Sequence, residues 1–89
     1  MTKNKADILL ARITRDPDIF DGKPIIRGKR LAVEHVLTDL SAGETPESII
    51  ANFPFLEAED IQACLLFAAR ELGQSYKKHT PQEPDAVTN

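Results

Sequence analysis

The chain has 89 residues, of which 42% are hydrophobic and 28% charged, and its net charge is −3. These values are typical of one small domain with a modest core. The single cysteine, Cys64, excludes an intramolecular disulfide, and no apolar run in the sequence is long enough for a signal peptide or a membrane span, so we expect a cytoplasmic protein.

Residues 1–31 are predicted to form an N-terminal arm and a short β-hairpin. The stretch ILLARIT, residues 8–14, is apolar and β-branched enough for a strand, although its Leu-Leu-Ala centre would also suit a helical turn. The stretch DPDIFDG, residues 16–22, contains Asp-Pro and Asp-Gly, which both favour a chain reversal. The chain should then return as a second short strand over residues 24–26, with the proline at its start or edge.

Three helices are predicted after the hairpin. The first covers about residues 32–42, where apolar side chains recur on one face. The second begins at the N-cap Thr45, with Pro46 at its first position. The third covers about residues 58–72 and ends at Gly73.

The predicted fold is therefore mainly α, with a short N-terminal β-hairpin followed by a three-helix, homeodomain-like helix-turn-helix unit over residues 32–73. The remaining residues, 74–89, are polar and contain prolines, so we expect them to be disordered in isolation. Acidic residues open the third helix, which would place carboxylates near phosphates in the usual docking of such a unit on DNA; they are Glu57, Glu59 and Asp60.

The third helix is apolar on two sides. One side is the expected core stripe, formed by Ile61, Cys64, Leu65, Ala68 and Leu72. The other side carries a second apolar patch, formed by Ala63, Leu66 and Phe67. This patch predicts the interface of a homodimer, and the alternative is that the N-terminal strand of the same chain covers it.

Positive charge is concentrated near the N-terminus. Residues 1–30 hold eight Lys or Arg against four Asp, whereas residues 31–89 hold three against ten Asp or Glu. Four of these cations lie in the segment GKPIIRGKR, residues 22–30, which we call the basic loop; they are Lys23, Arg27, Lys29 and Arg30. We predict that they bind DNA phosphates, with Gln62 as a candidate for base contacts; the alternative is that they balance Asp16, Asp18 and Asp21 within the hairpin.

The sequence offers no pattern typical of an enzyme or of a metal site. The two histidines, His35 and His79, are far apart and form no metal-ligand cluster with the single cysteine. A P-loop, a dinucleotide-binding glycine pattern and a nucleophilic serine turn are absent from the sequence. We therefore predict no catalytic residue, no metal and no cofactor.

The segment ITRDPDIFDGKPIIRGKRLAVEHVLTDLSAGETPESIIANFPFLEAEDIQACLLFAA, residues 13–69, resembles the bacterial and archaeal domain-of-unknown-function family 433. The combination of GKPIIRG with PFLEAEDI at this spacing carries the resemblance. It implies a β-hairpin followed by a homeodomain-like or winged-helix-like helical unit. It also implies a VapBC-like antitoxin that binds and blocks a toxin with a PIN-like nuclease domain and often represses its own operon.

Two functions remain open at this point. A DNA-binding antitoxin would use the basic loop on operator phosphates. A dimeric protein-interaction module without DNA binding would better explain the acidic start of the third helix. The placement of the four loop cations discriminates between them: cations gathered on one dimer face favour DNA, and cations dispersed into salt bridges with the hairpin aspartates favour the interaction module.

Overall fold

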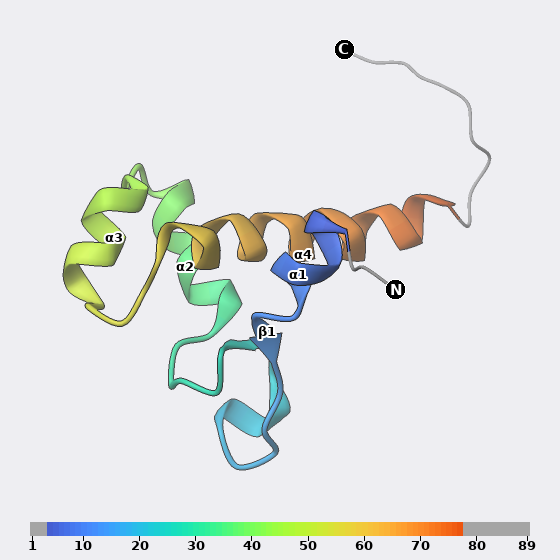
Figure 1. Ribbon diagram of the computed structural model, residues 1–89, viewed down its shortest axis with the longest axis horizontal. Helices are drawn as coiled ribbons and strands as arrows, with labels where there is room; N and C mark the ends of the chain where they lie inside the picture. The colour runs from blue at the N-terminus through green and yellow to red at the C-terminus, as the bar shows by residue number, and fades with distance from the viewer. Residues whose placement is uncertain (1–3, 78–89) are drawn as a thin grey trace.

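The computed structural model describes residues 4–77 of the chain, with side chains described through residue 73. The elements follow one another as α1 (Lys5–Leu10), β1 (Ile13–Thr14), the 3-10 helix η1 (Phe20–Gly22), β2 (Ile25–Ile26), α2 (Val33–Ser41), α3 (Pro46–Asn52) and α4 (Ala58–Lys77). The long helix α4 runs the length of the molecule, with α2 and α3 at one end and the hairpin along its side (Figure 1). The predicted mainly helical fold with an N-terminal hairpin is confirmed.

The N-terminal segment differs from the predicted strand over residues 8–14. Its first part belongs to the helix α1, which Asn4 caps by accepting a hydrogen bond of 2.8 Å from the backbone N–H of Asp7. The Leu-Leu-Ala sequence is compatible with either a helix or a strand, and the side-chain cap at Asn4 favours the helix. Only Ile13 and Thr14 form a strand, and they pair in antiparallel register with Ile26 and Ile25.

The turn that follows β2 contains a strained residue. Arg27 has a φ of 44° and Gly28 a φ of 69°, and the N–H of Lys29 donates to the carbonyl of Ile26 at 2.7 Å. Two successive positive φ values are typical of the hairpin turn that matches strand twist. Glycine adopts this conformation freely, whereas a left-handed conformation at arginine costs roughly 1–2 kcal/mol. The Arg27 side chain must therefore make contacts that compensate this cost.

Two helix predictions are confirmed at their ends. The Thr45 hydroxyl accepts a hydrogen bond of 3.1 Å from the N–H of Ser48, and Pro46 is the first residue of α3. The helix α2 lies within the predicted residues 32–42. These ends are set by local side-chain and backbone chemistry, which is readable from sequence.

Helix α4 is longer than predicted. It continues through Gly73 to Lys77, so the prediction that Gly73 ends the helix is wrong. Glycine costs about 1 kcal/mol in a helix interior but does not prevent helix formation. The first four residues of the predicted disordered tail are therefore helical, and residues 78–89 lie outside the described part of the chain.

One hydrophobic core joins the hairpin to the helices. Its buried members are Ile26, Leu31, Val33, Val36, Ile49, Leu56, Ile61 and Cys64. Burial raises the pKa of the Cys64 thiol to about 12, so this thiol is a core group rather than a reactive one. Among the described residues, no helix combines the length and the apolar character that crossing a membrane requires.

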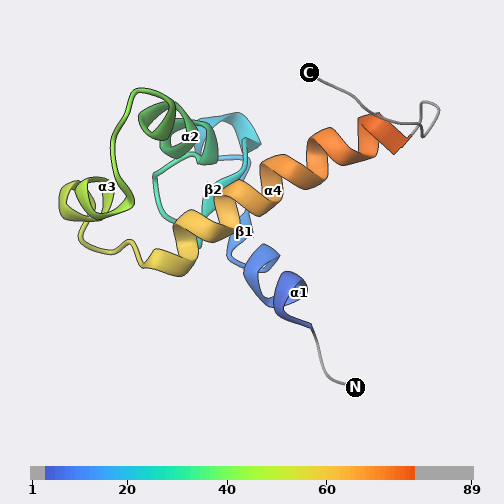
Figure 2. The same ribbon diagram turned by 90° about the horizontal axis from the view of Figure 1, so that it is seen from above.

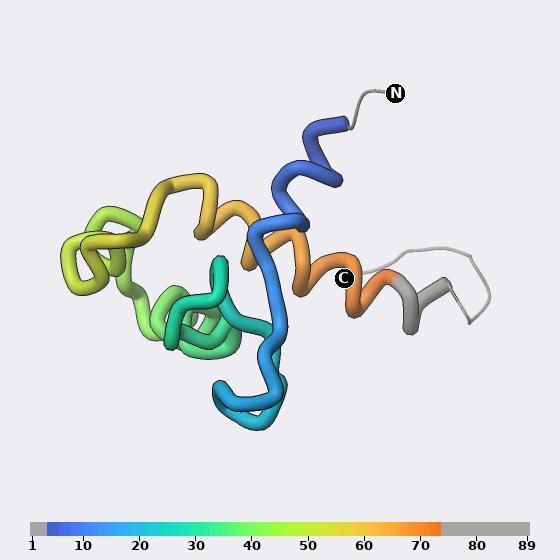
Figure 3. Tube along the Cα trace, turned by 60° about the horizontal axis from the view of Figure 1, so that its bottom comes forward, coloured from blue at the N-terminus to red at the C-terminus, as the bar shows by residue number. Residues whose placement is uncertain are grey.

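The face of α4 that enters the core differs from the predicted one. Leu65 and Leu72, expected in the core, are 51% and 72% exposed. Ala63, expected on a free patch, is fully buried, and Phe67 packs against the core cluster. The N-terminal segment crosses α4, and both α1 and β1 contact it (Figure 3). The buried face is thus displaced around the helix toward Ala63 and Phe67.

Candidate functional site

A buried carboxylate, Asp60, links the basic loop to the start of α4. Its side chain is fully buried and accepts four hydrogen bonds. Arg27 supplies two of them as a fork, with Nε 3.0 Å from Oδ1 and Nη2 2.9 Å from Oδ2. Arg12 Nη1 donates to Oδ1 at 2.9 Å, and the N–H of Glu57 donates to Oδ2 at 2.9 Å. We call Asp60, Arg12 and Arg27 the Asp60 cluster.

The helix geometry explains why this carboxylate lies there. Asp60 is the third residue of α4, and Glu57 is the residue just before the helix. A carboxylate in the first turn can accept from the N–H of the residue before the helix, which is one half of a capping box. The same position places the carboxylate near the positive end of the helix dipole. Asp60 therefore caps the helix as well as pairing with the arginines.

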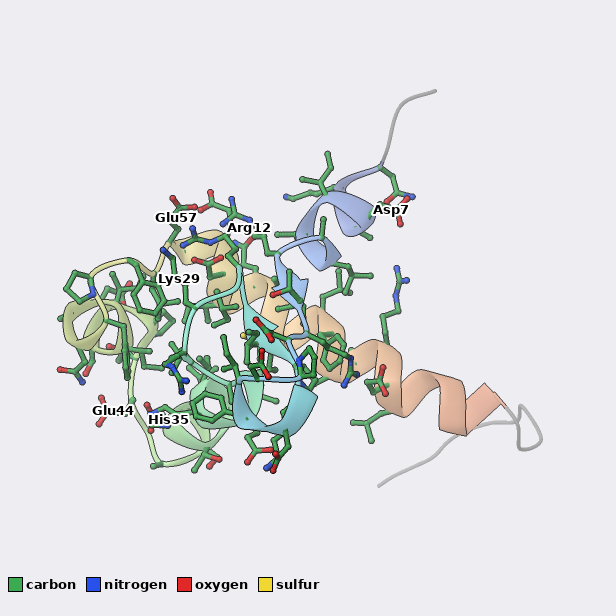
Figure 4. The ribbon with its side chains drawn as sticks, turned by 90° about the horizontal axis from the view of Figure 1, so that it is seen from below. Asp7, Arg12, Lys29, His35, Glu44 and Glu57 are labelled. Carbon is green, nitrogen blue, oxygen red and sulfur yellow. The ribbon has the colours of Figure 1, made fainter. Side chains whose placement is uncertain are left out.

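Two further contacts hold the arginines in place. Arg27 Nη2 also donates to the carbonyl of Phe55 at 2.7 Å. Arg12 Nη1 also donates to Glu57 Oε1 at 2.8 Å, and the two side chains lie beside each other in Figure 4. The positive φ of Arg27 is thus stabilised by three side-chain hydrogen bonds to α4 and to the segment before it.

The cluster keeps all three members charged. Burial alone would raise the pKa of Asp60, but the hydrogen bonds from Arg27, the Glu57 N–H and Arg12 together lower this pKa below its ordinary range. Hydrogen bonds to Glu57 and Asp60 raise the pKa of Arg12, and the bond to Asp60 raises the pKa of Arg27. A buried carboxylate with this many donors is a structural ion pair, which stabilises the hairpin against α4.

Two of the four predicted DNA-binding cations are paired with carboxylates of the chain. Arg27 points into the Asp60 cluster, and Lys23 Nζ lies 3.2 Å from Glu34 Oε2 in an exposed pair. The alternative prediction, that the loop cations pair with the hairpin aspartates, is wrong for these two, because their partners are Glu34 and Asp60. The Asp16 carboxylate instead accepts a hydrogen bond of 2.8 Å from the N–H of Asp18, which fixes the turn.

Lys29 and Arg30 are exposed and each lies over an aromatic ring. Lys29 Nζ is 5.8 Å from the centroid of Phe55, and the Arg30 guanidinium is 6.0 Å from the centroid of Phe20. Such contacts contribute little at an exposed site. These two cations remain accessible to an anionic partner.

The other predicted site residues lie on α4. Gln62 is exposed, Ala63 is buried in the chain's own core, and Leu66 and Phe67 are half-buried. Ala63 offers no surface to a second chain in this arrangement. The predicted interface formed by this patch remains a prediction for Leu66 and Phe67 only.

A cleft of about 560 Å³ lies between the hairpin and α2. Its lining includes Lys23 and Arg30 from the basic loop, and Glu34 and Asp39 from α2. Both cations and carboxylates therefore line it, and His35 Nε2 lies 3.3 Å from Asp39 Oδ2. Among the described residues, no group of three or more His, Cys, Asp or Glu is arranged to hold a metal ion.

The Asp60 cluster was missed by reasoning from the sequence. The sequence predicts Asp60 as one of three acids that suit the dipole of the third helix and repel DNA, and it assigns no role to Arg12. The available signal was an acidic residue three positions after Glu57, which indicates a capping role. The arginine partners are 48 and 33 residues away along the chain, so nothing local indicates them.

Comparison with known proteins places the chain within a family. A crystal structure of a DUF433 member protein from Anabaena variabilis ATCC 29413 superposes with a TM-score of 0.67, at 25% sequence identity over 81% of this chain and 71% of that chain. Residues 13–68 match the family described as protein of unknown function (DUF433), and the chain belongs to that family.

A curated relative is longer than this chain. The uncharacterized protein y4eO of Sinorhizobium fredii (strain NBRC 101917 / NGR234) is 36% identical over 64 residues, which are 70% of this chain and 29% of that protein. This chain thus covers less than a third of the relative's length. The similarity concerns the shared domain, and the rest of that protein has no counterpart in the alignment.

Proposed function

We propose that this protein is an antitoxin-like interaction module that binds and neutralises a PIN-like nuclease toxin. The observation that carries the proposal is that Arg27 forms an ion pair with Asp60 of its own chain. Because Arg27 is bound to Asp60 and Lys23 to Glu34, two of the four loop cations already have carboxylate partners. Two fewer cations are then available for DNA phosphates, which supply much of the affinity for DNA, and this favours a protein partner over DNA.

The charge of the remaining surface supports a nuclease as the partner. Residues 31–89 hold ten Asp or Glu against three Lys or Arg, and Glu47, Glu59 and Glu71 are exposed. A nuclease that binds RNA needs a cationic surface to hold the phosphates. An acidic protein is electrostatically complementary to such a surface and can exclude RNA from it.

Neutralisation can be tested by purifying the product of the reading frame next to the one that encodes this chain, which the proposal requires to be a PIN-like nuclease. We expect its RNA cleavage to fall to background at one antitoxin chain per toxin chain, and the inhibition to weaken as salt is raised, because charge pairs are screened. An unrelated ribonuclease serves as the control, since it should stay active if the RNA itself is not masked. Unchanged cleavage with no complex on size exclusion would refute the proposal.

Operator DNA is the second candidate, favoured by the exposure of Lys29 and Arg30. Replacing either by alanine should weaken promoter binding and reduce the salt slope of log K by about one, because each removes one phosphate contact. Lys5→Ala, an exposed cation on α1, is the matched control and should change neither quantity. Fluorescence anisotropy titrations at several salt concentrations measure both, and identical slopes in all variants would exclude these two side chains from a DNA surface.

A further inference from the structure

Helix α4 carries an exposed stripe that residues 4–77, the part of the chain that the structure describes, leave uncovered. The stripe consists of Ala58, Gln62, Leu65, Ala69 and Leu72, all of which are exposed. The spacing between them alternates between four and three residues. This alternation is the pattern with which a helix presents one seam to another helix.

The rest of the molecule lies elsewhere around α4. The side of α4 that carries Asp60, Ala63 and Cys64 is buried. Helix α1, in the N-terminal segment, also contacts α4. The second half of α4 extends away from α2 and α3 (Figure 2). Two leucines are therefore left on an accessible ridge, although burial of each would be favourable.

We propose that a second copy of this chain covers the stripe, with the two α4 helices packed antiparallel about a two-fold axis near Leu65. The inference concerns the free protein and does not depend on the proposed toxin. The homodimer expected from the sequence then uses a different face of the same helix from the patch of Ala63, Leu66 and Phe67.

Size and charge both favour this arrangement. Antiparallel pairing centred on Leu65 places Leu72 against Ala58 of the second copy, and Gln62 against Ala69 of the second copy, so large side chains meet small ones. The exposed Arg70 then lies toward Glu59 of the second copy, and the two-fold axis repeats this opposite-charge pair. A parallel pairing would instead bring Arg70 toward Arg70 of the second copy and Glu59 toward Glu59 of the second copy, and both pairs of like charges would repel.

The mass of the purified protein in solution tests the proposal. Light scattering over a range of concentrations should give twice the 9.9 kDa chain mass for the wild type and one chain mass for Leu72→Asp, with the helical circular dichroism retained. Phe20→Asp is the matched control, because Phe20 is also an exposed large apolar residue but lies in η1, and its φ of 49° suits aspartate. It should remain a dimer.

A charge exchange tests the orientation of the helices. Arg70→Glu should weaken the dimer, and the double variant Arg70→Glu with Glu59→Arg should restore it, because the two positions are eleven residues apart on one helix and meet only between copies. A monomeric wild type would overturn the proposal. If Leu72→Asp then weakened toxin binding, the stripe would be a toxin-binding surface and not a dimer interface. A dimer that survives Leu72→Asp, or a double variant without rescue, would also overturn it.

Discussion

Replacing Asp60 by alanine should destabilise the protein by roughly 3–5 kcal/mol, because it leaves two arginines without their buried partner. The side chains of Arg12 and Arg27 are 25% and 31% exposed, so water can solvate them in part and the lower end of this range applies. The substitution also removes the acceptor for the Glu57 N–H at the start of α4. Since domains of this kind are stable by about 5–15 kcal/mol, a large share of the total is at stake.

Urea unfolding followed by circular dichroism measures the effect. Glu59→Ala is the matched control, since Glu59 is the adjacent acidic residue of the same helical turn and is exposed. We expect its midpoint to stay close to that of the wild type. An Asp60→Ala midpoint equal to the control would mean that the Asp60 cluster contributes no net stability.

Acid should remove the same contribution without any substitution. The folded-state pKa of Asp60 is lower than the 3.8 of an ordinary aspartate, so the unfolded chain binds the proton more readily than the folded one. The stabilisation by the Asp60 cluster is therefore fully present above about pH 3.8 and is lost as the pH falls through the folded-state pKa. Protonation removes the negative charge that the two arginines require, and the hairpin should separate from α4.

The titration of Asp60 can be followed directly by carboxyl-carbon NMR alongside urea midpoints at a series of pH values. We expect Asp60 to titrate below 3.8 and the midpoint to fall steeply in the same interval. Asp60→Asn, which cannot ionise, provides the control and should lack this part of the pH dependence. Titration of Asp60 at or above 3.8 would contradict the assignment of the ion pair.

The features that the sequence predicted correctly are those set by neighbouring residues. The N-cap Thr45 and the following proline define the start of α3, and turn-forming pairs such as Asp-Gly define the hairpin. Each of these depends on chemistry within about four residues. The α1 helix was not predicted, because ILLARIT suits either a strand or a helix. The cap that decides for the helix, Asn4, lies outside that stretch.

The buried face of α4 could not be chosen from the sequence. Apolar residues surround much of this helix, so periodicity permits a core centred on Leu65 and Leu72 or one centred on Ala63 and Phe67. Burial of Asp60 decides between them, because its partners hold the adjacent side of the helix against the hairpin. That information comes from contacts across 33 and 48 residues, which no local pattern encodes.

The contact between Arg12 and Asp60 has a consequence for where the folding unit begins. The family match starts at residue 13, one position after Arg12 and after the whole of α1. A polypeptide trimmed to residues 13–68 would retain Asp60 and Arg27 but lose one of the two guanidiniums that neutralise the carboxylate. It would also uncover the part of α4 that α1 contacts. The domain boundary defined by folding thus lies upstream of the boundary defined by sequence similarity.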